Sequence, residues 1–318
     1  MPSRRVLQQP CPGLGSRPSA RDPPLLYGLG QRQRCSTSRR AILRGFAGLA
    51  GTSAARAHSE GRFSFGVTPV FLDNNMPLLS LLQEYLSYQL ERPIVLVKRR
   101  TIREISMMLL SGQLDAAWIC DFPYVQYQNR LALVAVPLYR HQPFRQAYVI
   151  VNKGSKATTF DEIRDTVHAF SDPDSTSGYL ITRWLLALRG ESPAEFFQNS
   201  FFTYSHRNII RAIGSGLGES GSVDGYVWDV MNERESALLD KTRIVFRSAP
   251  LGFPPVVALE TSRDLPATQA LAAALLGMTS DRLGREILSL LALDGFTTAS
   301  PDLYESTAEK WLLVKQQP

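Results

Sequence analysis

The chain has 318 residues, of which 44% are hydrophobic and 20% charged, as in globular proteins. No apolar run approaches the roughly 20 residues that a membrane helix needs. The formal net charge of +6 does not indicate nucleic-acid binding, because residues 1–57 hold ten Arg and one Asp. The remainder carries 25 basic and 28 acidic residues, a net charge of about −3.

The N-terminal stretch differs in composition from the rest of the chain. Residues 1–40 are rich in Pro, Gly, Ser and Arg, and Ser38-Arg39-Arg40 precedes a weakly apolar run at 41–55. The run ends in Ala55-Arg56-Ala57, a small-x-small cleavage pattern. This order resembles a twin-arginine export signal, and an arginine-rich disordered tail is the alternative. We therefore expect residues 1–57 to be an export signal with a disordered N-terminus, and the mature protein to be periplasmic.

The sequence lacks the patterns that metal sites and nucleophilic enzymes use. Cys11 and Cys35 lie in the expected signal, so Cys120 is the one remaining thiol and an internal disulfide is excluded. Zinc spacings, a Gly-x-Ser-x-Gly elbow, a His-Glu-x-x-His helix and a phosphate loop do not occur in the sequence. We therefore expect no metal, no cofactor and no catalytic residue.

The first part of the remaining chain alternates between strand and helix patterns. Alternating or β-branched runs predict strands at 62–67, 93–97 and 115–120, and helical spacing predicts helices at 77–90 and 101–111. Asp121-Phe122-Pro123-Tyr124 begins the next loop and helix. This βαβ order favours a largely parallel sheet.

A second α/β run begins after Tyr139. It predicts strands at 147–151, 167–170, 201–204 and 244–248, helices at 159–167, 179–189 and 207–213, and a strand entering a helix at 222–230. Helical patterns end the chain, at 267–278, 284–291 and 301–314. Two α/β runs suggest two lobes.

The segment before the helix at 179–189 has the chemistry of an anion cradle. Ser175, Thr176 and Ser177 lie where that helix starts, and Gly178 allows the backbone to approach closely. Unpaired N–H groups and the positive end of the helix dipole favour an anion there. The alternative is a capping cluster without a ligand, since Ser and Thr are preferred at helix N-caps.

Four motifs in register resemble those of the phosphonate/phosphite-type periplasmic binding proteins of ABC uptake systems. Asp172-Pro173-Asp174-Ser175-Thr176-Ser177-Gly178 resembles the family's Asp-Pro-x-Ser-x-Ser-Gly loop, and Tyr204-Ser205-His206 resembles its Ser-His. Ser222-Val223-Asp224-Gly225-Tyr226 is similar to its Val-Asp-Ala-Gly segment, and Ser111-Gly112-Gln113-Leu114-Asp115-Ala116-Ala117-Trp118 to its Gly-x-x-Asp-x-Ala-Trp segment.

The resemblance implies an α/β fold, that of a two-lobed type-2 periplasmic binding protein with its ligand cleft between the lobes. With that fold, we expect lobe 1 to comprise 62–143 plus 255–318, and lobe 2 to comprise 144–254. Ser175, Thr176, Ser177 and His206 match positions that hold oxyanion oxygens in the family.

Further residues of the expected ligand site are less specific. We expect the pKa of His206 to stay near its ordinary value, and a cap on the following helix is its other interpretation. Asp224 and Tyr226 are expected to line the cleft, although Asp224 can instead satisfy a turn. Aromatic groups after Cys120, Tyr124 among them, can form a cleft wall. The family's phosphonate binders often carry a tyrosine where this chain has Arg100-Thr101-Ile102, so only the oxyanion class is implied.

Cys120 ends a predicted strand, where α/β sheets present ligand-contacting residues. One interpretation is a small buried apolar side chain. The other is a thiolate that captures trivalent arsenic, because the resemblance extends to an arsenite-sensing branch that uses a cysteine.

We therefore expect a solute-binding protein rather than an enzyme. It clamps a small oxyanion of the phosphonate, phosphite or phosphate class for an ABC permease, acts as a monomer and has no nucleic-acid partner. The alternative keeps the clamp in a periplasmic oxyanion or arsenite sensor that signals to a membrane histidine kinase. An enzyme would need Ser175 or Ser177 paired with His206 as its base.

Overall fold

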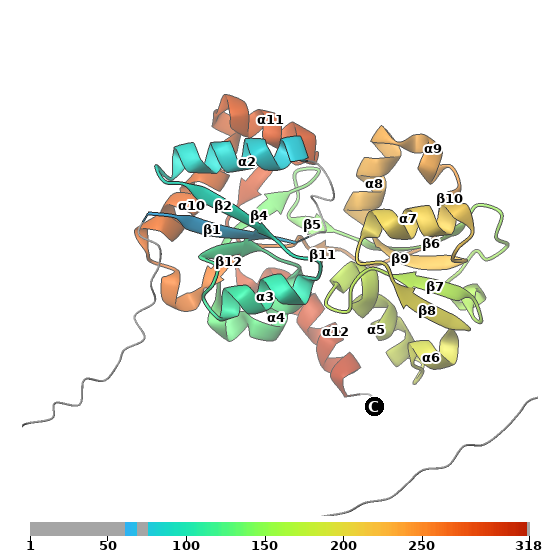
Figure 1. The fold of residues 1–318 in the computed structure, drawn as a ribbon. Coiled ribbons are helices and arrows are strands. Elements are labelled where there is room, and N and C mark those ends of the chain that lie inside the picture. The colour runs from blue at the N-terminus through green and yellow to red at the C-terminus, as the bar shows by residue number, and fades with distance from the viewer. Residues whose placement is uncertain (1–60, 69–75, 317–318) are drawn as a thin grey trace, which may run out of the picture. The chain divides into compact units, whose positions relative to one another are not determined.

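Two mixed sheets organise the residues that the computed structural model describes, 61–68 and 76–316 (Figure 1). The first sheet has the order β13 (Gly295–Thr297), β4 (Leu131–Leu138), β12 (Val256–Leu259), β3 (Ala116–Trp118), β1 (Phe63–Val67) and β2 (Ile94–Lys98). The second has the order β10 (Thr242–Arg247), β6 (Ala147–Asn152), β9 (Ser220–Asp224), β7 (Val167–Phe170) and β8 (Asn199–Phe202). Between them, β5 (Phe144–Arg145) pairs with β11 (Leu251–Gly252).

Helices cover both faces of each sheet. The six-stranded sheet carries α2 (Met76–Gln89), α3 (Ile102–Leu110), α4 (Asp121–Tyr127), α10 (Pro266–Leu276) and α11 (Arg282–Leu291). The five-stranded sheet carries the π-helix η3 (Thr176–Leu180), α5 (Ile181–Ala187), α6 (Pro193–Phe196), α7 (His206–Ser215), α8 (Gly225–Arg234) and α9 (Ser236–Leu239). Short 3₁₀ turns are η1 (Gln128–Arg130), η2 (Asp161–Ile163), η4 (Glu260–Ser262), η5 (Met278–Ser280) and η6 (Pro301–Tyr304).

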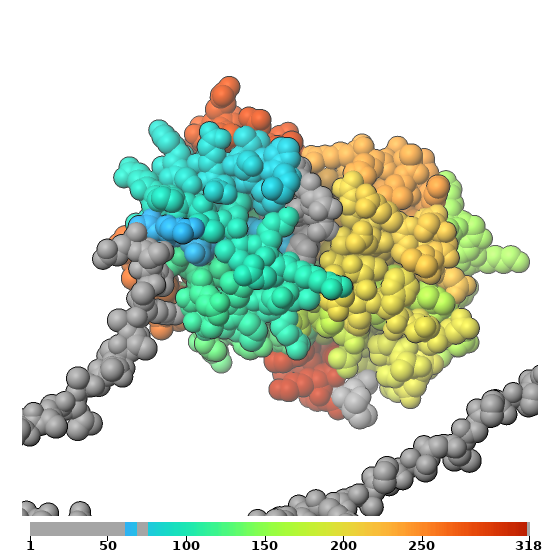
Figure 2. Space-filling view, viewed as in Figure 1, coloured from blue at the N-terminus to red at the C-terminus, as the bar shows by residue number. Residues whose placement is uncertain are grey.

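We call the six-stranded sheet with its helices the first lobe, and the five-stranded sheet with its helices the second lobe. The predicted two-lobed α/β fold is confirmed. The last helix, α12 (Glu305–Lys315), contacts both α4 of the first lobe and α5 of the second. In the space-filling view the two lobes meet along one boundary, and this C-terminal helix lies beneath it (Figure 2).

The prediction of a largely parallel sheet holds for the three strands of the first βαβ run, β1, β2 and β3, but is wrong for the whole sheet, in which β12, β4 and β13 pair antiparallel. Parallel pairs join β1 to β2 and β3, and β7 to β8 and β9. By contrast, β12 runs antiparallel to β3 and β4, and β6 runs antiparallel to β9 and β10. The chain leaves the first lobe after β4 and returns through β12, so these crossing strands run against their neighbours.

The helix predicted at 159–167 is also wrong. Only the 3₁₀ turn η2 forms there, and β7 already begins at Val167. The carboxylate of Glu162 accepts hydrogen bonds from the N–H groups of Thr158 and Thr159, and Asp165 has a φ of 59°. The Glu162 carboxylate therefore closes a single turn instead of starting a helix.

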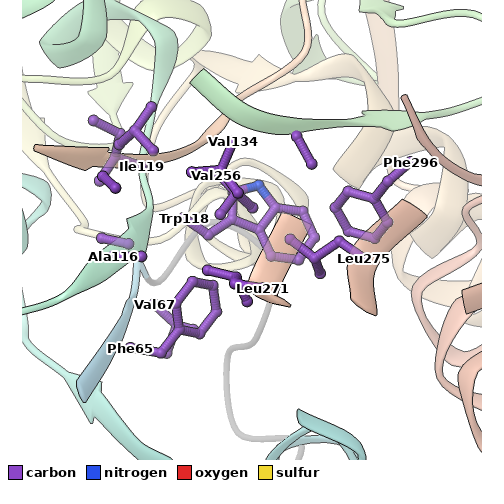
Figure 3. Close-up of a cluster of buried hydrophobic side chains, with 14 of the residues drawn as sticks. Phe65, Val67, Ala116, Trp118, Ile119, Val134, Val256, Leu271, Leu275 and Phe296 are labelled. Atoms are coloured by element: carbon purple, nitrogen blue, oxygen red, sulfur yellow. The ribbon is translucent and has the colours of Figure 1, made fainter. Parts of the chain in front are cut away.

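Trp118 ties the returning chain to the core of the first lobe (Figure 3). Its indole N–H donates to the carbonyl oxygen of Pro254 at 2.9 Å, and its ring meets that of Phe296 edge-on at 5.6 Å. Phe65 of β1 and Leu271 of α10 belong to the same buried cluster. One aromatic side chain thus packs residues from both ends of the described chain into one core.

Among the described residues, no helix is long and apolar enough to cross a membrane. The predicted export signal at 1–57, with Cys11 and Cys35, lies outside the described residues.

Candidate functional site

The loop that follows β7 is held in shape by its own hydrogen bonds. The Asp172 carboxylate accepts from the N–H of Asp174 at 2.8 Å, and the Asp172 carbonyl accepts from the N–H of Ser175 at 3.0 Å. The Ser175 hydroxyl oxygen in turn accepts from the N–H of Gly178 at 3.0 Å. Ser175 therefore caps the helix start, which is the structural alternative left open by the sequence.

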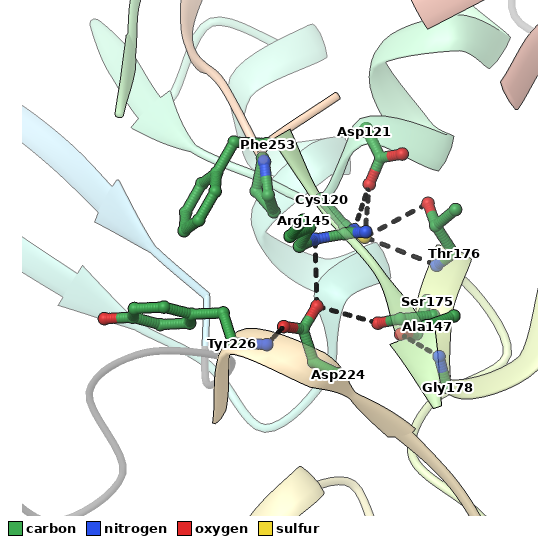
Figure 4. A network of polar contacts seen from close by, with 12 residues as sticks. Cys120, Asp121, Arg145, Ala147, Ser175, Thr176, Gly178, Asp224, Tyr226 and Phe253 are labelled. Atoms are coloured by element: carbon green, nitrogen blue, oxygen red, sulfur yellow. Dashed lines mark hydrogen bonds and ion pairs between the residues drawn. The ribbon is translucent and has the colours of Figure 1, made fainter. Parts of the chain in front are cut away.

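The next two hydroxyl groups, those of Thr176 and Ser177, contact residues outside the loop, and Figure 4 shows Thr176 beside Cys120. The Thr176 hydroxyl lies 3.5 Å from the Cys120 sulfur, which also accepts from the N–H of Thr176 at 3.4 Å. The Ser177 hydroxyl donates to the Asp224 carboxylate at 2.9 Å. Cys120 belongs to the first lobe, so the predicted cradle lies at the boundary between the lobes and is buried there.

Gly178 brings the loop into contact with α7. A β-carbon at this position would lie 1.7 Å from the Ser171 hydroxyl oxygen and 2.9 Å from Cε1 of His206. Only a residue without a side chain fits between these groups. The sequence-predicted loop and His206 are thus brought together.

His206 is the first residue of α7, after the N-cap Ser205. Its Nδ1 accepts from the N–H of Asp224 at 3.1 Å, which assigns the ring proton to Nε2. Burial lowers the pKa of His206 to about 4, with the Asp224 carboxylate opposing and Arg145 reinforcing the shift. The expectation of an ordinary pKa is therefore wrong, because it neglected burial: His206 is a neutral N–H donor at neutral pH.

Acid is expected to destabilise the fold through His206. Between pH 6.5 and about 4 the unfolded chain binds a proton that the folded protein does not, so stability present above pH 6.5 is lost on acidification. The loss reaches about 3 kcal/mol from this one group. Urea unfolding at several pH values measures it, and His206→Gln should show a shallower pH dependence. Identical slopes in the variant and the wild type would contradict the assignment.

Sequence reasoning missed Arg145 of β5, which lies at the centre of the network in Figure 4. Its side chain is 0% exposed. The guanidinium lies 2.6 Å from the Asp121 carboxylate of the first lobe and 2.9 Å from the Asp224 carboxylate of the second. Burial disfavours its charge, but the two carboxylates together raise the pKa of Arg145 above its ordinary value.

A sequence signal for Arg145 exists in the strand alternation. Arg145, Ala147, Val149 and Val151 occupy alternate positions, and all four are buried. Alternate residues of an extended segment face the same side, so the side chain of this arginine faces the same side as these buried apolar residues. Arginine is rarely fully buried without a partner, which makes such a position a marker of a functional or ion-paired site.

Asp121 connects this network to the C-terminal helix. Its second carboxylate oxygen accepts from the Thr307 hydroxyl of α12 at 3.0 Å, and its first accepts from the Cys120 thiol at 3.3 Å. Burial raises the pKa of Cys120 to about 12, with the Asp121 charge adding to the effect. At neutral pH the thiol is therefore protonated and serves as a weak donor.

The two tyrosines that were predicted to line the cleft pack against other aromatic side chains. Tyr124 meets Tyr304 edge-on at 4.9 Å in the core of the first lobe. The ring of Tyr226 packs against Tyr139 and Phe253, and its hydroxyl donates to the carbonyl oxygen of Leu291 in the first lobe. The backbone N–H of Tyr226 joins the network by donating to the Asp224 carboxylate at 3.0 Å.

The acidic residues of the loop also bridge the lobes. The Asp172 carboxylate accepts from the N–H of Ile102, at the start of α3, at 3.1 Å. Asp174 pairs with Arg103 at 3.0 Å. Nearby, the guanidinium of Arg100 lies 5.0 Å from the ring centre of Tyr204. The basic residues flanking the start of α3 thus contact the second lobe.

Comparison with known proteins places the chain in a family. Residues 65–304 match the family model described as ABC transporter, phosphonate, periplasmic substrate-binding protein. Among solved structures, a binding protein component of an ABC phosphonate transporter from Pseudomonas aeruginosa is 15% identical, with a TM-score of 0.73 over 81% of this chain and 87% of that chain.

PhnD1 from Prochlorococcus marinus MIT 9301, solved in complex with methylphosphonate, is 17% identical, with a TM-score of 0.71 over 80% of this chain and 99% of that chain. The periplasmic aliphatic sulphonate binding protein SsuA from Escherichia coli is 16% identical, with a TM-score of 0.54 over 81% and 94% of the two chains. At these identities the structures establish a shared fold. Because the family model spans most of its length, this chain belongs to the phosphonate-type periplasmic substrate-binding proteins of ABC transporters.

Proposed function

We propose that this protein binds a small tetrahedral oxyanion of the phosphonate, phosphite or phosphate class and delivers it to an ABC permease. It acts as a monomer in the periplasm after export by a twin-arginine-type signal. Its lobes comprise 62–143 plus 255–318, and 144–254. The proposal rests on one observation: the Ser175–Gly178 loop lies against His206, and both are buried at the lobe boundary.

The chemistry of these groups supports an anion. The Ser177 hydroxyl now donates to a carboxylate oxygen, which is an anionic acceptor, as an oxygen of the proposed ligand would be. A bound oxyanion can take over this hydrogen bond from Asp224. The neutral imidazole of His206 keeps its Nε2 proton over the whole physiological pH range, so it donates without a pH switch.

Closure of the lobes around the ligand supplies the binding environment. Groups of both lobes meet at the loop, through the Thr176–Cys120 and Asp172–Ile102 contacts. A hinge at the connecting segments β5 and β11 lets these contacts open and close. In the closed form the site is shielded from water. Hydrogen bonds to charged groups are stronger in such a site than in water.

The geometry favours binding over catalysis. A serine nucleophile needs a base within hydrogen-bonding reach of its hydroxyl. Here the Ser177 hydroxyl donates to Asp224 and the Ser175 hydroxyl accepts from Gly178, while Nδ1 of His206 accepts from a backbone N–H. Neither serine is thus hydrogen-bonded to His206.

Thermal unfolding of the purified protein with phosphite, phosphate, methylphosphonate, sulfate, arsenate and arsenite tests the proposal. A ligand at 100 times its Kd stabilises the folded state by about 2.7 kcal/mol. Phosphorus oxyanions are expected to raise the Tm, and Ser177→Ala is expected to weaken the effect. If no oxyanion of the panel shifts the Tm, the proposed function is wrong.

The thermal unfolding measurement with arsenite tests the alternative function as a sensor. The protonated state of the Cys120 thiol disfavours capture of a soft ion in this closed form. A shift in Tm with arsenite that Cys120→Ser abolishes would favour a sensor over an importer component.

A further inference from the structure

Arg145 has unused hydrogen-bonding capacity at the lobe boundary. Its Nη2 donates to Asp121 at 2.6 Å. Its Nε lies 2.9 Å from an oxygen of Asp224, but the N–H is not directed at that oxygen, and Nη1 has no partner among the described residues. A buried guanidinium is costly when its donors are unpaired. The unpaired N–H groups of Arg145 therefore favour a site in which a ligand supplies further hydrogen-bond acceptors.

The charges around Arg145 also favour a role in binding an anion. Arg145 is the one Arg or Lys that is buried among the described residues, and it lies between the carboxylates of Asp121 and Asp224. The nearby imidazole of His206 is neutral, and the Cys120 thiol is protonated. Without the guanidinium, an anion at the loop would face two buried carboxylates and no cation, and their repulsion is strong in a low-dielectric site.

We propose that Arg145 is a ligand-binding residue whose guanidinium contacts the anionic group and selects doubly charged oxyanions over singly charged ones of the same shape. The inference rests on the proposed function. In the ligand-bound protein, Nη1 and Nε donate to ligand oxygens, while Asp121 and Asp224 hold the guanidinium plane between the lobes. Selectivity follows because a fixed positive charge attracts a dianion more strongly than a monoanion.

Calorimetric titration with methylphosphonate and methanesulfonate tests the charge selectivity. Both ligands are tetrahedral anions with one methyl group, and the sulfonate cannot take a second negative charge. The wild type is expected to prefer methylphosphonate at pH 8. Arg145→Met is expected to weaken methylphosphonate binding by roughly 100-fold and methanesulfonate binding by roughly 10-fold. Arg145→Lys, which keeps the charge without the planar fork, should retain the preference at reduced affinity.

The controls separate ligand contact from a purely structural role. Arg103→Met removes another arginine that bridges the lobes, but one whose side chain is 71% exposed, and should leave the ratio of the two affinities unchanged. If Arg145 only holds the lobes together, Arg145→Met lowers both affinities by the same factor, and the inference is wrong while the proposed function stands. If the wild type binds neither anion in this titration nor any oxyanion in the thermal panel, the proposed function itself fails.

Folding of the neutral variant is checked by circular dichroism before titration. Should Arg145→Met fail to fold, Arg145→Gln takes its place, because its amide can still donate to Asp121 without a positive charge. The same loss of selectivity is expected for it, and an unchanged affinity ratio in a folded Arg145→Gln protein overturns the inference.

Discussion

Replacing Asp224 by alanine is expected to lower the free energy of unfolding by about 3–5 kcal/mol. The substitution leaves the buried Arg145 guanidinium with one carboxylate in place of two. It also removes the acceptor for the Ser177 hydroxyl and for the N–H of Tyr226 at the start of α8. Urea denaturation measures the effect as a lower midpoint at an unchanged m-value.

A matched control and a second substitution sharpen this test. Asp240→Ala removes an exposed carboxylate from the same lobe and should change stability by no more than about 0.5 kcal/mol. Adding Arg145→Met to Asp224→Ala should cost less than the sum of the two single changes, because the uncompensated charge disappears with its partner. A loss below about 1 kcal/mol in Asp224→Ala would show that the ion pair is not a main stabilising contact.

Local patterns in the sequence were sufficient to predict the helix-start loop. Strand, turn residues, hydroxyls and helix follow one another in the segment at 167–189, and the interactions that shape it are short in range. The proximity of the loop to His206 and Asp224 followed from the family resemblance rather than from periodicity. In the structure this proximity rests on Gly178, whose missing side chain lets α7 approach the loop.

The central ion pairs could not be predicted in the same way. Arg145, Asp121 and Asp224 come from three segments that no local pattern relates to each other. Their meeting depends on the angle between the lobes and on the register of β5. Asp121 also begins α4, so its favourable position at a helix N-terminus offered a sufficient local explanation for an acidic residue.

Helix prediction failed where capping residues occur without a following apolar face. Thr158 and Glu162 form the hydrogen bonds typical of a helix N-terminus, yet the chain turns into β7 within a few residues. By contrast, Thr101 and Glu104 form a capping box before the apolar face of α3, and that predicted helix is confirmed. Tertiary burial of the following residues therefore decides whether a capped turn grows into a helix.

Gly178→Ala is expected to abolish ligand binding with a loss of stability of about 1–3 kcal/mol. The added methyl group would lie 2.6 Å from the β-carbon of Ser171 and 2.9 Å from Cε1 of His206, so the loop and α7 must move apart. Displacing the imidazole by a fraction of an ångström misaligns the hydrogen bond that we propose it donates to the ligand. Calorimetric titration with the oxyanion that gives the largest Tm shift measures binding, and urea denaturation measures stability.

A compensating substitution tells a local clash from general damage. Ser171→Gly in the Gly178→Ala background removes both atoms of Ser171 that the new methyl group meets, and should restore most of the stability. Gly154→Ala is the matched control, because its nearest neighbour would be Asn152 Oδ1 at 3.4 Å, an ordinary contact. Because His206 remains close to the methyl group, ligand binding should recover less than stability. Full recovery of binding would mean that the contact between Gly178 and His206 does not set the geometry of the site.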